Sequence, residues 1–452
     1  MHLFSLKGIN VAVDSESGSI NLLDEVSYNI LKAFPETFSL EEAVEKFEGK
    51  YSVELIKEVY EEIKTLEKEG SIFSPELTSE GLSIKRDKDF AIKALCLNIA
   101  HDCDLACKYC FASKGSYKLK KSIMPVEVAL KAVDFMLENS GSRKNLEIDF
   151  FGGEPLLNYD LIVETVKYAR EKEKDTGKRF NFTVTTNGTL LDTEKIDFIN
   201  NNMDNVVISI DGRQETHDDM RCFPSGEGSY DNIVPKAMEL IKKREKDKSY
   251  FVRGTFTAKN LDFSKDVLHV ADLGAKEISI EPVVGKGESF HIKPENLPVI
   301  FLEYEKLLDE ILKRNRQGNP FRFYHFNLNI YKGPCIHKRI TACGAGSEYF
   351  AVSTNGDLYP CHQFVGQKEF IIGSVKEGLK NFELKKTFDN TNIFSKEACK
   401  KCWAKLYCSG GCHANSYFST GSINIPDEIA CQMQKKRLEC AIVFEALKAY
   451  PC

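Results

Sequence analysis

The residues most able to do chemistry are cysteines, and the first group of them lies on one short loop. The loop reads Cys103-Asp104-Leu105-Ala106-Cys107-Lys108-Tyr109-Cys110, a CxxxCxxC spacing that follows a predicted strand. Three thiolates this close together can hold three irons of a [4Fe–4S] cluster and leave the fourth iron open to another ligand. A structural zinc site is the alternative interpretation, but zinc prefers four ligands and no fourth residue lies nearby.

A second group of cysteines lies in the last quarter of the chain. Cys343 is followed by Gly356 and Cys361 in the form C-x12-G-x4-C. The others follow in the spacing CxxCx5CxxxC plus one separate residue, and they are Cys399, Cys402, Cys408, Cys412 and Cys431. This array predicts metal ligation, with two zinc sites as the alternative to iron–sulfur clusters.

Metal ligation explains the number of cysteines better than disulfide bonds do. The chain has 15 Cys among 452 residues, and a reducing cytoplasm disfavours disulfides. Cys96, Cys222, Cys440 and Cys452 fit no ligand pattern. We expect Cys96 and Cys440 to behave as small buried hydrophobic side chains.

Composition excludes several classes of function. The net charge of −6 provides no basic surface for nucleic acid. No apolar run approaches the roughly 20 residues that span a bilayer. Residues 1–7 lack the basic start and long apolar stretch of a signal peptide. We therefore predict a cytoplasmic protein with neither nucleic acid nor a membrane as a partner.

Hydrophobic periodicity divides the chain into three parts. Residues 1–75 read as three short strands followed by three amphipathic helices, a winged-helix-like order, and a polar linker follows at 76–90. Strands are then expected near 91–99, 146–151, 180–185, 205–210, 250–257 and 276–281. Because helical stretches separate these strands, residues 91–325 are predicted to form an α/β core with a parallel sheet, open or closed as a barrel. Residues 326–452 are expected to form a further domain, and because the stretch from about 330 to about 431 has little apolar material, we expect metal to stabilise it.

Glycines and polar residues follow the predicted strands, at the ends where parallel α/β folds place their chemistry. The second strand of the core ends in Phe151-Gly152-Gly153-Glu154-Pro155. Its glycines allow a ligand to approach the backbone closely, and Glu154 can accept hydrogen bonds from an ammonium group. Further polar candidates are Thr185, Asn187, Ser209, Asp211 and Arg253. A guanidinium suits a carboxylate, so Arg253 is predicted to bind one rather than form a surface ion pair. Turn chemistry alone is the alternative for Thr185 and Asp211.

The Cys loop, with an aromatic residue, Tyr109, before its last Cys, resembles the signature of the radical S-adenosylmethionine (SAM) superfamily. The resemblance implies a partial (β/α)6 TIM-like barrel and a [4Fe–4S] cluster on Cys103, Cys107 and Cys110 whose open iron binds SAM. The Gly-Gly-Glu loop would bind the methionine amino group, and the polar strand-end residues would contact the SAM ribose and carboxylate. In this family the reduced cluster cleaves SAM to a 5′-deoxyadenosyl radical, which abstracts hydrogen from a substrate carbon.

The second group of cysteines resembles the SPASM extension of radical SAM maturases. The resemblance implies two auxiliary clusters and therefore three [4Fe–4S] clusters in all. The inner cluster would bind to Cys343, Cys361 and Cys412, and the outer one to Cys399, Cys402, Cys408 and Cys431. In sulfatase-maturing relatives a Cys shortly before the array completes the inner cluster, and Cys335 lies in that region here. Either Cys335 closes the inner cluster or a substrate Cys fills its open iron.

The whole chain resembles the SCIFF-type peptide maturases, which build thioether crosslinks of the sactionine or ranthipeptide kind in a Cys-rich ribosomal peptide. Segments 342–349 and 359–366 and the winged-helix-like start carry this resemblance. It implies that residues 1–75 form a recognition element for ribosomally synthesised and post-translationally modified peptides (RiPPs), which binds the leader of a precursor peptide by strand addition. An external one-electron reductant such as flavodoxin or ferredoxin is the other implied partner.

Two other functions compete with thioether formation. The first is an anaerobic sulfatase maturase, which oxidises a Cys or Ser side chain to formylglycine. Those enzymes carry Asp directly after the equivalent of Cys361, and this chain has His362, which could also serve as a base. The second is a non-catalytic iron–sulfur electron-transfer or peptide-binding protein, against which the full set of SAM-binding motifs argues.

Overall fold

An 11-stranded sheet is the largest element of the computed structural model, which describes residues 1–79, 91–330 and 336–449. Six consecutive parallel strands form its centre, in the order in which they occur along the chain. They are β4 (Ala94–Ala100), β5 (Asn145–Gly152), β6 (Arg179–Thr186), β7 (Asn205–Ser209), β8 (Ser249–Phe256) and β9 (Glu277–Pro282). Each overlaps a strand that the sequence predicts, and the α/β class with a parallel sheet is confirmed.

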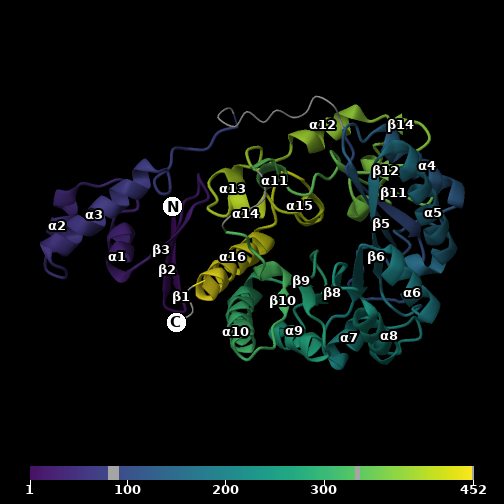
Figure 1. The fold of residues 1–452 in the computed structure, drawn as a ribbon, viewed down its shortest axis with the longest axis horizontal. Helices are drawn as coiled ribbons and strands as arrows, with labels where there is room; N and C mark the ends of the chain where they lie inside the picture. Colours follow the sequence, from purple (N-terminus) through teal and green to yellow (C-terminus); the bar gives the residue numbers. More distant parts are fainter. Residues whose placement is uncertain (80–90, 331–335, 450–452) are drawn as a thin grey trace.

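Helices connect the parallel strands and cover the outside of the sheet (Figure 1). They are α4 (Val126–Glu138), α5 (Tyr159–Thr176), α6 (Thr193–Asn202), α7 (Gln214–Met220), α8 (Tyr230–Lys243) and α9 (Phe263–Asp272). Their apolar faces pack on alternate strand residues, so that Phe150, Phe182 and Val133 belong to one core. This arrangement brings the carboxyl ends of all six strands to the same edge.

The C-terminal part extends this sheet at both edges. Strand β10 (Arg322–Phe323) pairs with β9, and β11 (Tyr349–Val352) pairs in parallel with β4. The short strands β12 (Asp357–Tyr359), β13 (Gly373–Ser374) and β14 (Gly378–Leu379) continue outward from β11. This part also has an apolar cluster that includes Phe364, Phe370 and Phe388, so it holds more apolar packing than the sequence suggests.

Short helices and one long helix complete the C-terminal part. They are α11 (Ile336–Thr341), α12 (Phe382–Asn390), α13 (Glu397–Lys400), α14 (Lys405–Cys408), α15 (His413–Thr420) and α16 (Glu428–Ala449). Helix α16 packs against α10 (Leu297–Arg316), which follows the last parallel strand. Figure 1 shows α13 to α16 between the N-terminal residues and the parallel sheet.

The N-terminal residues form a three-stranded antiparallel sheet and three helices. The strands are β1 (His2–Leu6), β2 (Ile9–Val13) and β3 (Ile20–Leu23), and the helices are α1 (Glu25–Ala33), α2 (Leu40–Phe47) and α3 (Val53–Lys68). A capping box of Ser39 and Glu42 begins α2. The helices share an apolar cluster of their own, whereas Phe4 and Val11 of the small sheet join the main core.

The small N-terminal sheet is docked on the segment that carries several of the predicted cluster ligands. The ring of His2 stacks on Trp403, with 4.1 Å between ring centroids. The carboxylate of Glu16 accepts hydrogen bonds from Lys405 Nζ at 2.7 Å, and the side chain of Lys405 is almost fully buried. These contacts hold the stretch between Cys402 and Cys408 against the N-terminal residues.

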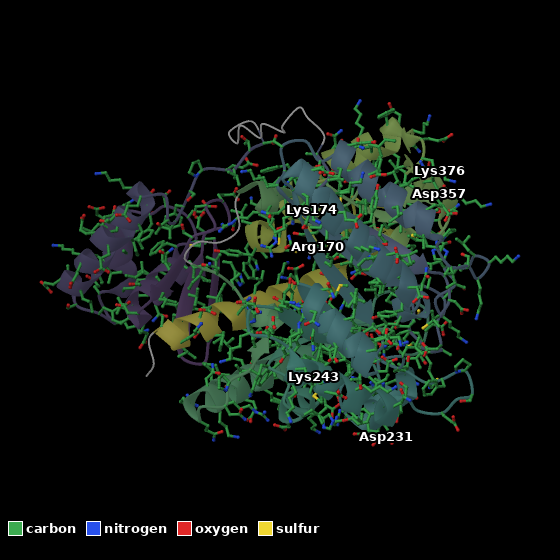
Figure 2. The ribbon with its side chains drawn as sticks, turned by 45° about the vertical axis from the view of Figure 1, so that its right-hand side comes forward. Arg170, Lys174, Asp231, Lys243, Asp357 and Lys376 are labelled. Atoms are coloured by element: carbon green, nitrogen blue, oxygen red, sulfur yellow. The ribbon has the colours of Figure 1, made fainter. Side chains whose placement is uncertain are left out.

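The outer surface is mainly charged. Figure 2 shows Lys174, Asp231 and Lys243 on the outside of the molecule, and all three are exposed. Lys243 forms ion pairs with Asp197 and Glu239, as expected for a solvated helix face. Within the described residues, no helix is both long and apolar enough to cross a membrane.

Candidate active site

A cavity of about 720 Å³ lies at the carboxyl ends of the parallel strands. One side, here named the strand-end wall, contains residues that follow the strands: Cys103, Cys107, Cys110, Gly153, Asn187, Ser209, Arg253 and Glu281. The opposite side, here named the C-terminal wall, contains Cys343, His362, Cys408, Cys412, Cys431 and Arg437. Members of both predicted cysteine groups therefore face one space.

The loop of Cys103, Cys107 and Cys110 is held from two directions. The amide of Gly153 donates to the carbonyl of Ala100, and the amide of Glu154 donates to that of Asp102. On the other side, the amides of Ala106 and Lys108 donate to the carbonyls of Cys222 and Met220. The loop is thus positioned by β5 and by the segment after α7, and not by its own sequence alone.

Glycines are required where this loop meets the end of β5. A Cβ atom on Gly153 would lie 2.0 Å from the carbonyl oxygen of Asp102, closer than any real contact. A Cβ on Gly115 would lie 2.7 Å from Cys103 Cβ. The Gly-Gly pattern therefore has a local physical reason: it lets two backbone segments touch beside the thiols.

Most of the residues expected to contact SAM line the cavity. These are Tyr109, Gly152, Gly153, Thr185, Asn187, Ser209 and Arg253. Glu154 and Asp211 do not line it, because both are buried behind it. The guanidinium of Arg253 also lies 3.3 Å from the carboxylate of Glu281. Arg253 therefore lines the cavity and forms an ion pair at the same time.

Glu154 connects β5 to the end of β6. Its carboxylate accepts hydrogen bonds from Thr186 Oγ1 and the Asn187 amide at 2.7 Å, and from the Leu156 amide at 3.0 Å. Burial nevertheless raises the pKa of Glu154 to about 7. The side chain of Asn187 in turn donates to Asp104 at 2.8 Å, which ties this network to the Cys loop.

Asp211 supports the wall from behind. It accepts a 2.6 Å hydrogen bond from the Tyr109 hydroxyl and a 3.0 Å hydrogen bond from the Thr255 amide. Arg221 donates to the same Tyr109 hydroxyl at 3.0 Å and lines the cavity near Cys107. Sequence reasoning missed Arg221, because nothing in its neighbours indicates that the chain returns to the Cys loop at this point.

The thiols affect one another's pKa within the groups that the resemblance implies. In the SAM group, burial raises the pKa of Cys107 to about 11, and Cys110 adds to the rise. Burial raises the pKa of Cys361, and Cys412 and Cys343 contribute to the rise. Burial raises the pKa of Cys431 to about 12, with further contributions from Cys408, Cys399 and Cys402. Cys335 lies outside the described residues.

Among the residues that the structure describes, no group of three His, Cys, Asp or Glu side chains converges closely enough to hold one metal ion. Buried thiols that raise one another's pKa fit a ligand that displaces their protons.

His362 stands at the boundary between the two walls. Its ring lies 4.9 Å from that of Phe151 and 5.7 Å from that of Phe111, and its Nδ1 is 3.0 Å from the Tyr349 hydroxyl. Burial lowers the pKa of His362 to about 4, and Arg253 contributes to the decrease. The ring is therefore neutral at pH 7.

Two families of known proteins match different segments of this chain. Residues 97–252 match the radical SAM superfamily, and residues 343–403 match SPASM, an iron–sulfur cluster-binding domain. The chain carries a radical SAM domain and a SPASM domain. These matches support a radical SAM enzyme that binds SAM and iron–sulfur clusters, with most of the strand-end wall in the first matched segment and part of the C-terminal wall in the second.

Curated relatives of the chain include several maturases. The radical SAM cyclopropyl synthase TigE of Paramaledivibacter caminithermalis is 24% identical over 76% of this chain and 72% of its own length. A cysteine-type anaerobic sulfatase-maturating enzyme of Clostridium novyi is 24% identical over 75% of this chain and 92% of its own. The PqqA peptide cyclase of Bradyrhizobium diazoefficiens is 26% identical over 73% of this chain and 83% of its own length.

Solved structures agree on the fold. The structure described as native anSMEcpe with bound AdoMet has a TM-score of 0.65 and 22% identity, and the match covers 80% of this chain and all of that one. SuiB of Streptococcus suis, bound to S-adenosylmethionine, has a TM-score of 0.51 and 14% identity over 93% of this chain and 96% of its own. The predicted radical SAM fold with a C-terminal SPASM domain is thus confirmed.

Proposed function

We propose that this chain is a peptide maturase that forms an intramolecular thioether bond between a Cys sulfur and a carbon of another residue in a Cys-rich ribosomal precursor peptide. The observation that carries the proposal is the shared cavity. Its strand-end wall presents Cys103, Cys107 and Cys110, and its C-terminal wall presents Cys343 and Cys412. A peptide in this space can place one residue at the radical SAM wall and a thiol at the other.

The strand-end wall would hold the SAM cluster and SAM. Cys103, Cys107 and Cys110 would ligate the cluster, and the cavity-lining residues from Tyr109 to Arg253 would contact SAM. When bound, these cofactors supply a 5′-deoxyadenosyl radical that takes a hydrogen atom from a substrate carbon. The chain itself orients the reacting groups and keeps water away from them. Glu154 and Asp211 act from behind the wall, as hydrogen-bond acceptors that hold Asn187 and Tyr109.

The C-terminal wall would hold the auxiliary clusters and receive the substrate thiol. We assign Cys343, Cys361 and Cys412 to the inner set and Cys399, Cys402, Cys408 and Cys431 to the outer set. The electrostatic grouping of the thiols supports this division. Cys343 and Cys412 are the exposed members of the inner set, so a substrate Cys in the cavity would lie beside them.

The N-terminal residues would bind the leader of the precursor peptide. Strand β3 is an edge strand, paired only with β2 within the described residues, so a peptide can add to its free edge. The other side of this small sheet contacts α16, which carries Cys431. A bound leader would therefore be anchored close to the C-terminal wall.

Mass spectrometry of a Cys-rich precursor peptide tests the proposal. The anaerobically reconstituted enzyme is incubated with SAM, a one-electron reductant and the peptide. We expect 5′-deoxyadenosine, a peptide that has lost two hydrogen atoms, and one fewer thiol available for alkylation. The Cys103→Ala/Cys107→Ala/Cys110→Ala variant is the matched control. If the enzyme makes no 5′-deoxyadenosine, the chain is a binding or electron-transfer protein instead.

Formylglycine formation is the second candidate function. The extensive match to the sulfatase-maturating enzyme of Clostridium novyi favours it. That reaction needs a base for the substrate side chain, and His362 follows Cys361 where those enzymes carry Asp. The low pKa of His362, about 4, makes the ring a weak base and counts against this candidate. In the same experiment, replacement of the Cys sulfur by an aldehyde oxygen would select formylglycine formation.

A further inference from the structure

A buried lysine lies among the cysteines of the C-terminal wall. Lys396 precedes α13, and its side chain is fully buried. No carboxylate lies within 4.0 Å of its Nζ in the part of the chain that the structure describes. Lys405, nine residues later, is also buried but is neutralised by Glu16 at 2.7 Å. Two buried lysines on one segment therefore differ in whether a carboxylate neutralises them.

The contacts of Lys396 place it between the two auxiliary sets. Its Nζ donates to the carbonyl of Gly410 at 2.7 Å and lies 3.5 Å from His413 Nδ1. Gly410 belongs to the turn that joins Cys408 of the outer set to Cys412 of the inner set. The lysine thus holds the one short stretch of chain that connects both sets.

Lys396 contacts the chain beside ligands of both sets, because its carbonyl accepts a 2.9 Å hydrogen bond from the Cys399 amide and its Nζ donates to Gly410. Burial lowers the pKa of Lys396, and Cys399, Cys408, Cys412 and Cys431 act against that decrease when they carry negative charge. A cation removed from water without an anionic partner is strongly destabilised. The thiolates that ligate metal are the negative charges available at this position. Lys396 is therefore an unpaired charge only as long as the cysteines around it are protonated.

We propose that Lys396 is the buried counter-charge shared by both auxiliary clusters, and that its positive charge raises their reduction potentials. This inference rests on the ligand assignment under Proposed function. Adding an electron makes a cluster more negative, and a fixed cation beside its ligands stabilises that reduced form. Lys396 acts through the ligands and not on the substrate, so it is a positioning residue.

Potentiometric titration of the reconstituted holoenzyme, followed by electron paramagnetic resonance, tests the role of this charge. In Lys396→Met we expect the equilibrium constant for reduction of each auxiliary cluster to fall at least tenfold, which corresponds to 59 mV for one electron. The potential of the SAM cluster should stay unchanged. The control is Glu16→Gln/Lys405→Met, which removes a neutral pair from the same segment and should leave all potentials unaltered.

The outcomes separate a charge effect from a packing effect. Unchanged auxiliary potentials in Lys396→Met, with full iron content, would overturn the proposal. If Lys396→Met loses auxiliary iron, Lys396→Arg decides the question. If Lys396→Arg keeps the auxiliary iron and the parent's reduction potentials, the charge role is supported. If Lys396→Arg loses the iron as well, Lys396 serves packing and the proposal is overturned. A parent enzyme with iron at the SAM site alone would instead refute the ligand assignment itself.

Discussion

The two walls of the cavity are built in different ways. The strand-end wall rests on six parallel strands, and backbone hydrogen bonds fix its Cys loop to β5 and to the segment after α7. The C-terminal wall is built from turns, short helices such as the four-residue α14, and the first turns of the long helix α16. Side-chain contacts with the N-terminal sheet hold part of it in place. The first wall is preformed by the fold, whereas the second depends on docking and, in our proposal, on metal.

The largest expected effect separates the walls by their metal content. The Cys103→Ala/Cys107→Ala/Cys110→Ala variant should lose all SAM cleavage, because these cysteines would hold the cluster that lies beside the proposed SAM contacts. Iron content should fall from about twelve to about eight per chain, counting four per cluster. Iron analysis and chromatography of 5′-deoxyadenosine measure both. Continued 5′-deoxyadenosine production would contradict the assignment of the strand-end wall.

A smaller change should break the strand-end wall by geometry alone. Gly153→Ala would put a methyl group 2.0 Å from the Asp102 carbonyl oxygen, so the Cys loop must move. We expect at least a hundredfold loss of SAM cleavage, with auxiliary iron retained. Gly49→Ala is the matched control, because a Cβ there meets nothing within 4 Å. Normal SAM cleavage by Gly153→Ala would show that this close contact is not needed.

The C-terminal wall should be sensitive to its docking contact. Glu16→Gln leaves the buried ammonium of Lys405 without its carboxylate, which should lower the free energy of unfolding by about 2 kcal/mol. Auxiliary iron should also be lost faster to a chelator. Lys50→Met is the control, since its ion pair with Glu25 is exposed. Equal stability and equal iron loss in Glu16→Gln and the parent would contradict a docked C-terminal wall.

The smallest expected effect concerns a carboxyl group inside the parallel sheet. Burial raises the pKa of Asp149 to about 7, and Glu147 adds to the rise. The folded state therefore binds more protons than the unfolded state between about pH 4 and pH 7, so stability falls as pH rises through this window. The slope from one group is at most about 1.4 kcal/mol per pH unit. Denaturant titrations at several pH values should show a weaker dependence of stability on pH for Asp149→Asn than for the parent. The same pH dependence in both proteins would contradict the raised pKa of Asp149.

Local patterns predicted the strand-end wall well. The six parallel strands and the loops after them could be located because hydrophobic periodicity and glycine placement are local signals. The partners of Asp211 could not be predicted in this way: its carboxylate accepts hydrogen bonds from the Tyr109 hydroxyl and the Thr255 amide. The direction of a side chain at a strand end depends on partners that are distant in sequence.

The C-terminal wall was less predictable, although its cysteine spacing is distinctive. The pairing of β11 with β4 joins residues about 250 positions apart, and neither strand indicates its partner. The buried Lys396 was equally hidden, because only the fold shows that its Nζ reaches the Gly410 carbonyl between Cys408 and Cys412. Spacing identifies ligands, but the charges around them become visible only in three dimensions.

Isotope transfer from the substrate tests the central claim most directly. A precursor peptide deuterated at carbon is incubated with the reconstituted enzyme, SAM and a reductant, and both products are analysed by mass spectrometry. The account predicts 5′-deoxyadenosine that carries one deuterium, and a peptide that has lost one carbon-bound deuterium and one thiol hydrogen. Unlabelled 5′-deoxyadenosine with an unaltered peptide, or a Cys converted to an aldehyde, would contradict it.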